Sequence, residues 1–481
     1  MIKGRFLVFL FVASVWPPGW SQDTALGAFL SDPAMTHASM SLCIRDAVSG
    51  MPVLDYGSQK RMNPASVLKL ITSAAALELL GADYTFTTGV GYTGKFNRKS
   101  GILKGDIVIR GGGDPALGSG RLADHYGDFM SRWADALSGM GIRKIKGRVI
   151  TDDSYYDYLP VPAKWLWEDI GNYYGAGAFG LSVFDNTYEI HLRTTSVSAT
   201  PIITGIFPEE CRRLLDNRLV AEGNTDKGYV FAAPYIGNGW LAGSVPEDRD
   251  DFVLKASIPD PPQLVAEITD KKLREKGIRI AGTPTTTREL VVFKGGELTP
   301  VASVVSPTLS EIVEILNHES VNLYAEHLLK ELGKVFMDTG TTAAGIEVVR
   351  QFLTGSGVIT DGMFIEDGSG LSPLNAISSE EMANLLIHMR TRGKYFREFY
   401  SSFPEAGQKG TIAKYFQDPV FNSNLRAKSG SMTRVRSYAG YFTTHSGKEM
   451  TFCVMVNNFT GPSHRIVTLI ESLLKQIILN S

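Results

Sequence analysis

Ser66 and Lys69 are the residues whose types and spacing most directly indicate covalent chemistry. Residues three apart on a helix lie on one face, so the amine of Lys69 can reach the hydroxyl of Ser66. A buried lysine loses proton affinity through desolvation and can then serve as a general base for a serine nucleophile. The N-terminus of the same helix would stabilise negative charge that develops near Ser66.

This pair lies on a predicted apolar helix. Asn63 is a good N-cap, Pro64 suits the first helical position, and Gly81 is placed to end the helix after Leu80. The residues between them leave almost no polar face, which is typical of a helix inside a lobe. About two Ser-x-x-Lys pairs are expected by chance in a chain of this length, so the catalytic interpretation depends on this placement.

Two polar triplets follow further along the chain. A Ser-Val-Asn triplet begins at Ser320, at a junction between two predicted helices, and a Lys-Ser-Gly triplet begins at Lys428, just before a predicted strand over 435–444. Each triplet alone is a weak signal. Their order matters more, because the motifs Ser-x-x-Lys, Ser-Asp-Asn and Lys-Thr-Gly follow one another in this way in penicillin-binding proteins and class A β-lactamases.

The sequence resembles the low-molecular-mass class C penicillin-binding proteins, the D-alanyl-D-alanine carboxypeptidase/endopeptidase family. Val321 replaces the usual Asp, and Ser429 replaces the usual Thr but keeps the hydroxyl. The long gap from Ser66 to Ser320 fits the two domains that this family inserts between its first and second motifs. Further segments that match the family are spread over the mature chain: 111–115, 165–169, 173–175, 260–262, 367–372 and 410–411.

The resemblance implies an acyl-enzyme mechanism. Ser66 would attack the carbonyl between two terminal D-alanines, or in a D-alanyl cross-link, while Lys69 takes its proton, and water would then hydrolyse the acyl-enzyme. Ser320 would relay a proton to the leaving amine, and Asn322 would bind the substrate amide. β-Lactam antibiotics would acylate the same serine, and no metal or organic cofactor is needed. The residues implied to hold the substrate carboxylate and to complete the oxyanion hole follow one another: Lys428, Ser429, Gly430 and Ser431.

The resemblance also implies a pocket for the diamino acid of a peptidoglycan stem peptide. Asp169 and Tyr174 match two of its residues, and we expect Asp169 to contact the free amine. Pro373 stands where the family has an arginine, so the usual partner of the distal carboxylate is missing. Either another cation supplies the charge, with Arg434 and Arg436 as candidates, or the substrate differs.

The N-terminal segment is typical of a secretory signal peptide. Lys3 and Arg5 precede an apolar run over 6–16, which is shorter than the roughly 20 residues that span a membrane. The triplet 19–21 suits cleavage before Gln22. An uncleaved anchor is the alternative. Cleavage removes both cations and no acidic residue, so the formal net charge changes from -2 to -4. We expect a mildly acidic, periplasmic protein.

The composition of the 481-residue chain is that of a globular protein, with 43% hydrophobic and 20% charged residues. It excludes a disordered chain, a collagen-like repeat and a polybasic nucleic-acid binder, and it leaves the oligomeric state open. Three cysteines are too few for a disulfide scaffold, and Cys43 and Cys453 lie in apolar runs where burial is expected.

The expected fold class is multi-domain α/β, with α+β character. A β-lactamase/transpeptidase-like catalytic domain would have an antiparallel sheet flanked by helices, and two nested strand-rich domains would be inserted into it. The expected boundaries are 1–21 for the signal peptide, 22–85 and 291–481 for the discontinuous catalytic domain, 86–193 and 251–290 for the inserted domain, and 194–250 for the nested one.

Two alternative functions stay open, and so does the role of one aromatic cluster. The same motifs fit a β-lactamase, although no dedicated group for activating the deacylating water stands out in the sequence. A non-catalytic, cell-wall-binding scaffold is a further alternative, which the intact motifs disfavour. An aromatic cluster could stack on glycan or pack between domains, with equal support for both: Trp165, Trp167, Tyr173 and Tyr174.

Overall fold

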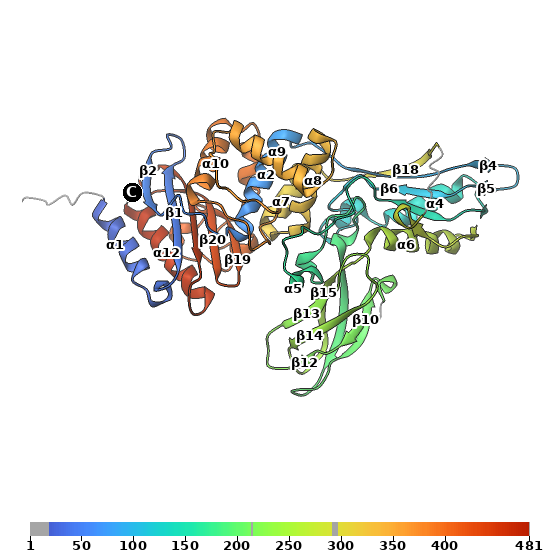
Figure 1. Ribbon diagram of the computed structural model, residues 1–481, viewed down its shortest axis with the longest axis horizontal. Coiled ribbons are helices and arrows are strands. Elements are labelled where there is room, and N and C mark those ends of the chain that lie inside the picture. The colour runs from blue at the N-terminus through green and yellow to red at the C-terminus, as the bar shows by residue number, and fades with distance from the viewer. Residues whose placement is uncertain (1–18, 213–214, 291–296, 481) are drawn as a thin grey trace, which may run out of the picture.

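The computed structural model of the protein describes residues 19–212, 215–290 and 297–480. Figure 1 shows a helix-rich lobe at one end, an elongated strand-rich part at the other, and a small β-module that projects from the side. Most of the predicted signal peptide lies outside the described residues, and its final segment, 19–21, falls in the first turn of α1 (Gly19–Leu30). No helix within the described ranges has the length and apolar character that crossing a bilayer requires.

The helix-rich lobe contains five antiparallel strands. Strands from both ends of the chain lie side by side in this sheet, with Cys43 opposite Cys453. Both cysteines are buried, as expected. The antiparallel sheet flanked by helices confirms the predicted fold class. The strands are β1 (Ser39–Asp46), β2 (Pro52–Tyr56), β19 (Arg426–Met432), β20 (Val435–Thr443) and β21 (Glu449–Asn457), in the sheet order β19-β20-β21-β1-β2.

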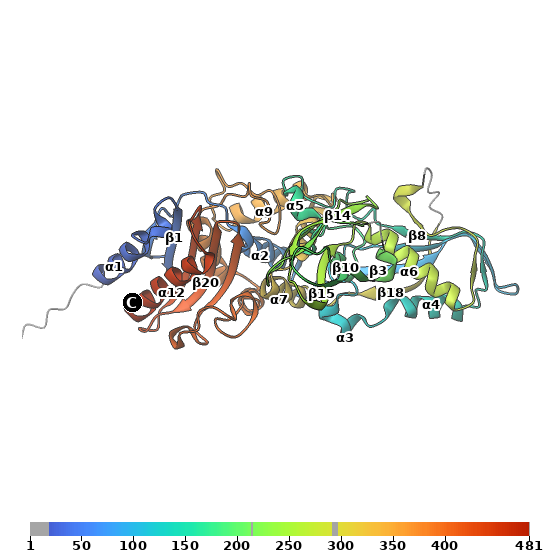
Figure 2. The ribbon, with the colours of Figure 1, turned by 90° about the horizontal axis from the view of Figure 1, so that it is seen from below.

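Helices cover both faces of this sheet (Figure 2). α1 packs against α12 (Ser463–Asn480) on one face, and α2 (Lys69–Leu80) and α10 (Ser379–Arg392) lie on the other. α2 is buried over most of its length, and Gly81 ends it with a φ of 95°, which confirms the predicted stop. Four more helices pack around α2: α7 (Leu309–Glu319), α8 (Asn322–Met337), α9 (Thr342–Gly355) and α11 (Phe396–Ser401).

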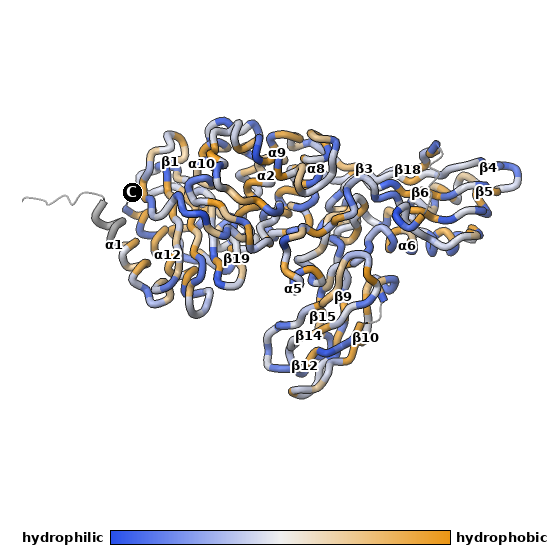
Figure 3. The backbone as a smooth tube through the Cα atoms, viewed as in Figure 1, coloured by the Kyte–Doolittle hydropathy of each residue, from blue (hydrophilic) through white to orange (hydrophobic). Residues whose placement is uncertain are grey.

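The elongated part contains two sheets, one of five strands and one of four. Its far hairpin ends in a hydrophilic tip around Arg98 and Lys99 (Figure 3). Three helices accompany the sheets: α3 (Ala123–Tyr126), α4 (Phe129–Gly139) and α6 (Pro261–Glu275). The strands are β3 (Thr87–Tyr92), β4 (Lys95–Asn97), β5 (Ile102–Lys104), β6 (Ile107–Arg110), β7 (Lys144–Ile145), β8 (Val149–Asp152), β16 (Arg279–Ile280), β17 (Thr285–Thr286) and β18 (Thr299–Val305), in the orders β17-β8-β6-β3-β18 and β16-β7-β5-β4.

The last strand of the elongated part revises one predicted boundary. β18 pairs with β3, with Val305 opposite Thr87. The predicted return to the catalytic domain at residue 291 is therefore too early, because main-chain pairing holds β18 in the inserted sheet as far as Val305.

The β-module has two sheets, and α5 (Trp167–Ile170) and the 3₁₀ turn η4 (Tyr173–Gly175) pack against it. Its two longest strands extend beyond the predicted limits of 194–250. They pair antiparallel to each other, with Thr187 in the first opposite Ser257 in the second. The strands are β9 (Thr187–Thr194), β10 (Ile202–Phe207) and β15 (Arg249–Ser257) in the first sheet, and β11 (Leu215–Asn217), β12 (Val220–Ala221), β13 (Lys227–Phe231) and β14 (Gly239–Val245) in the second.

Candidate active site

The three sequence motifs meet at the end of the helix-rich lobe that adjoins the inserted part. Lys69 Nζ lies 3.0 Å from Ser66 Oγ and 2.6 Å from Asn322 Oδ1, which joins the first motif to the second. Lys428 Nζ donates to Ser320 Oγ at 2.8 Å, which joins the third motif to the second. The structure thus brings together side chains that the sequence spreads over more than three quarters of the described chain.

The serine stands in a turn that the third motif approaches closely. The helix predicted from Pro64 begins instead as a 3₁₀ turn, η2 (Ala65–Leu68). Ala65 has a φ of 46°, in the left-handed region, so a regular α-helix cannot begin there. On β19, a Cβ atom at Gly430 would lie only 2.9 Å from the backbone nitrogen of Ser66. Glycine therefore permits the close approach of β19 to the turn that carries Ser66.

Lys69 is fully buried, and burial lowers its pKa to about 7. The carboxylates of Asp367 and Glu326 act in the opposite direction and favour the charged amine. Besides Ser66 and Asn322, the amine has a third neighbour, the carbonyl oxygen of Ser369 at 2.7 Å. At neutral pH the lysine is therefore neutral in a substantial fraction of molecules, as a general base must be.

A buried carboxyl that the sequence did not reveal, that of Glu326, binds the loop whose Ser369 carbonyl contacts Lys69. Glu326 accepts hydrogen bonds from the backbone N–H groups of Gly368 and Ser369. Burial, together with the charge of Asp367, raises the pKa of Glu326 to about 8. Glu326 lies four residues after Asn322 on α8, so the helical spacing could have placed both on the face that meets the lysine.

Asp367 holds the same loop from its other side. Its carboxylate accepts hydrogen bonds from Gly370 N, Ser372 N, Asn375 Nδ2 and Trp165 Nε1. The segment 367–372, which matches the family, therefore forms a loop fixed by Asp367. This loop contacts Lys69 through the Ser369 carbonyl oxygen.

Lys428 is also fully buried, and burial together with the charge of Lys69 lowers its pKa well below the usual range. A carboxylate that enters beside it would favour the charged amine again. Ser429 Oγ donates to Thr411 Oγ1 at 2.7 Å, so the 410–411 segment lines this corner. Ser431 follows on the same strand and has an exposed side chain. The contribution of its backbone N–H to an oxyanion hole stays a prediction.

Asp169 and Tyr174 lie together beside the second motif. The Tyr174 hydroxyl bonds to the Asp169 carboxylate, and burial nonetheless raises the pKa of Asp169. The backbone carbonyl of Tyr174 accepts a hydrogen bond from Asn322 Nδ2 at 2.8 Å. The two predicted pocket residues are thus adjacent to each other and tied to the catalytic site, while their contact with a diamino acid stays a prediction.

The missing pocket cation is not supplied by Arg436. Its Nε donates to Ser463 Oγ at 3.0 Å, at the start of α12. The next residue, Ser437, donates to the Pro64 carbonyl beside Ser66. Because successive side chains of a strand point to opposite faces, Arg436 points away from the active site. Arg434 is exposed in the turn between β19 and β20. Pro373, at the position of the family's arginine, is exposed as well.

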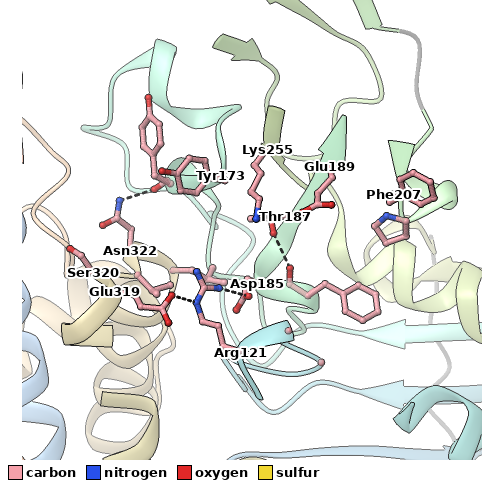
Figure 4. Close-up of a pocket in the computed structure, with 17 residues that line it drawn as sticks. Arg121, Tyr173, Asp185, Thr187, Glu189, Phe207, Lys255, Glu319, Ser320 and Asn322 are labelled. Carbon is pink, nitrogen blue, oxygen red and sulfur yellow. Dashed lines mark hydrogen bonds and ion pairs between the residues drawn. The ribbon is translucent and has the colours of Figure 1, made fainter. Parts of the chain in front are cut away.

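A cleft of about 920 Å³ opens beside Ser320 and Asn322 (Figure 4). Arg121 from the inserted part bonds to Glu319 and to Asp185, each at 2.6 Å, and so ties the inserted part to the residue before Ser320. No residue spacing in the sequence predicted these two ion pairs of Arg121. The rest of the far wall comes from the β-module and the segment before it: Thr187, Glu189, Phe207, Pro208 and Lys255.

The chain is similar to known proteins over most of its length. The chain is 28% identical over 451 residues to a D-alanyl-D-alanine carboxypeptidase of Actinomadura sp. (strain R39), with 91% of this chain and 81% of the relative covered. It is 23% identical over 470 residues to the D-alanyl-D-alanine carboxypeptidase DacB of Haemophilus influenzae, with 92% and 93% covered.

Among solved structures, penicillin-binding protein 4 from Haemophilus influenzae shares the fold, with a TM-score of 0.78 and 21% identity over 92% of this chain and 96% of that one. The same protein in complex with a β-lactam has a TM-score of 0.74 and 20% identity, over 94% and 98% of the chains. The family described as D-Ala-D-Ala carboxypeptidase 3 (S13) matches residues 22–469, almost the whole chain. This protein therefore belongs to the D-Ala-D-Ala carboxypeptidase 3 (S13) family of serine-type peptidases.

Proposed function

We propose that Ser66 is the nucleophile of this serine-type D-Ala-D-Ala carboxypeptidase, and that its substrates are the stem peptides of peptidoglycan. The single observation that carries the proposal is the set of three neighbours around the Lys69 amine. The Asn322 side-chain oxygen and the Ser369 carbonyl can only accept, so each takes an N–H of the amine. A neutral amine then has its lone pair free for the Ser66 hydroxyl.

Acylation follows from this geometry. The Ser66 proton passes to Lys69 as Oγ forms a bond with the carbonyl carbon of the penultimate D-alanine. Ser320 accepts a hydrogen bond from Lys428 and keeps its own O–H, which it donates to the leaving nitrogen. The C–N bond breaks as the nitrogen takes the Ser320 proton, the ammonium of Lys69 reprotonates Ser320, and D-alanine leaves. Neutral Lys69 then takes a proton from water as the water oxygen attacks the ester carbon, and this proton passes to Ser66 Oγ as the ester C–O bond breaks.

The third motif holds the substrate's terminal carboxylate in this scheme. Lys428, the Ser429 hydroxyl and Thr411 form a polar corner beside Ser320. A carboxylate bound there would keep Lys428 charged and would place the scissile bond against the nucleophile.

The cleft supports larger leaving groups than D-alanine. It begins at Ser320, the residue that the family resemblance places on the leaving-group side, and its volume is about 920 Å³. We therefore include endopeptidase cleavage of D-alanyl cross-links in the proposal. The predicted signal peptide supports a periplasmic location, and acylation of Ser66 by β-lactams is part of the same proposal.

The test uses the mature protein with fluorescent penicillin and with a D-Ala-D-Ala stem peptide. We expect a stable covalent adduct and D-alanine release, both lost in Ser66→Ala and both kept in Ser446→Ala, an exposed serine remote from the site. Rapid penicillin turnover without D-alanine release would indicate a β-lactamase. The absence of any adduct would favour the non-catalytic scaffold.

A further inference from the structure

Four aromatic rings gather on the outer side of the β-module and of α5, and we call them the aromatic platform. Phe231 and Trp240 stack with their ring centroids 5.2 Å apart and their planes 11° apart. Trp167 lies 6.1 Å from Trp240 and 6.4 Å from Phe231. Tyr229 extends the row, with its ring 6.3 Å from Phe231.

Three of these rings share one face of a sheet. Phe231 on β13 pairs with Trp240 on β14, and Tyr229 is two residues before Phe231, so all three side chains point to the same side. Val230 and Leu241 alternate with them and are fully buried on the opposite side. The module thus has its core on one face of the sheet, and the platform is on the outer face.

Two rings of the platform are open to solvent, whereas Phe231 and Trp240 are half-buried. Trp167 is 51% exposed and Tyr229 is 37% exposed. Its neighbour Trp165 is buried instead and donates its Nε1–H to Asp367 at 2.7 Å. The aromatic cluster of the sequence is therefore divided: Trp165 serves packing between the inserted part and the catalytic lobe, and Trp167 is available to a ligand.

The platform and the Asp169 pocket belong to one rigid segment. Trp167 and Asp169 are two residues apart on α5, with Asp169 buried and Trp167 exposed. Asn172 Oδ1 accepts from Val230 N at 3.1 Å, and Ser257 N donates to the Gly171 carbonyl at 2.9 Å, so the segment is fixed to the module. The platform and the pocket therefore keep a fixed position relative to each other.

We propose that the aromatic platform binds the glycan strand of peptidoglycan by stacking against its sugar rings, while the attached stem peptide enters the active site. This inference rests on the proposed function, because it takes the substrate to be a peptide carried on glycan. The face of a pyranose ring presents C–H groups, which pack against the electron-rich face of an aromatic ring. A row of flat rings, two of them exposed and two half-buried, suits a neutral polymer of flat rings, whereas the carboxylates of a stem peptide find no donor on these faces.

A binding experiment tests the platform without catalysis. A tetramer of N-acetylglucosamine is titrated calorimetrically into the full-length mature protein and its variants. We expect wild-type protein to bind, Trp240→Ala to bind about tenfold more weakly, and Trp240→Phe to keep part of the affinity. Phe336→Ala removes an exposed ring at the end of α8, away from the platform, and should bind as wild type does. No binding by wild type, or undiminished binding by Trp240→Ala, would overturn the proposal.

An activity experiment separates the platform from the proposed function. D-alanine release is measured from a free pentapeptide and from the same peptide carried on glycan strands, at limiting substrate. Trp240→Ala should release D-alanine from the free peptide at the wild-type rate and from the glycan-borne peptide about five- to tenfold more slowly. An equal loss on both substrates would overturn the platform. If wild type released none from the free peptide, the proposed function would fail, and the tetramer titration would still decide the platform.

Discussion

The side-chain oxygen of Asn322 lies 2.6 Å from the amine of Lys69 and connects the second motif with the first. An amide oxygen accepts a hydrogen bond without adding a charge, so it orients the amine and leaves its proton affinity low. A carboxylate in the same place would favour the protonated amine.

Asn322→Asp should therefore raise the pKa of Lys69 and move the acid limb of penicillin acylation to higher pH, by about 1 to 2 units. The measurement is the acylation rate constant with fluorescent penicillin between pH 5 and 10. Asn424→Asp is the matched control, because Asn424 bonds to the Thr443 carbonyl away from the site. An unchanged acid limb in Asn322→Asp would contradict the assigned contact.

The wild-type enzyme should itself show an acid limb centred near pH 7. Burial lowers the pKa of Lys69 to about 7, so the neutral base is lost as the pH falls through that value. Lys69→Arg, which cannot lose its proton, should reduce acylation at least about 100-fold at every pH. Lys448→Arg on an exposed turn should leave the profile unchanged. Normal acylation by Lys69→Arg would rule out the lysine as base.

Glu326→Ala should destabilise the protein more than Glu326→Gln. The alanine leaves the buried N–H groups of Gly368 and Ser369 without an acceptor, at a cost of about 1–3 kcal/mol each. Glutamine keeps an acceptor oxygen for these N–H groups and resembles the protonated carboxyl, the form that burial favours by raising the pKa of Glu326. Urea unfolding at pH 7 measures the difference, with the exposed Glu347→Ala as control. Equal destabilisation by alanine and glutamine would contradict the role of these hydrogen bonds.

Gly430→Ala should reduce acylation by about 100-fold, because a displacement near 1 Å at a reacting group has an effect of this size. The added Cβ would lie 2.2 Å from Ser437 Oγ, 2.7 Å from the Pro64 carbonyl and 2.9 Å from Ser66 N. Gly355→Ala, where nothing lies within 4 Å of the added atom, is the control. Stopped-flow acylation with a chromogenic β-lactam provides the rates, and a Gly430→Ala rate equal to that of Gly355→Ala would disprove the close approach.

Asp169→Ala should weaken turnover of a stem peptide that carries a diaminopimelate amine. We expect the loss mainly in KM, because Asp169 is bonded to Tyr174 and lies apart from the nucleophile. The comparison peptide has the amine acetylated, and for it the variant and the wild type should differ little. Unchanged turnover of the free-amine peptide by Asp169→Ala would mean that the pocket binds something else.

Much of the catalytic site could be predicted from the sequence, because each motif is local. The contact of Ser66 with Lys69 follows from helical spacing, and the end of α2 follows from Gly81. The start of α2 could not be predicted, since the left-handed Ala65 depends on a distant loop: a Cβ atom at Gly370 would lie 2.0 Å from the Ala65 carbonyl.

The parts that the sequence did not reveal depend on contacts between distant segments. Arg121 contacts Glu319 only because the inserted part folds back on the lobe. Neither residue lies in a sequence motif that would predict this ion pair. The domain boundary near residue 291 failed for a similar reason, because the pairing of β18 with β3 joins segments more than two hundred residues apart.

The pairing of β1 with β21 determines when the enzyme can become active during folding. Cys43 and Cys453 face each other across 410 positions of the chain, so the central sheet cannot close until nearly all of the polypeptide is available. Bringing such remote ends together costs chain entropy and is slow compared with forming local hairpins. The inserted part and the β-module can therefore fold first. Reactivity toward penicillin should arise late, which makes it a sensitive readout of complete folding.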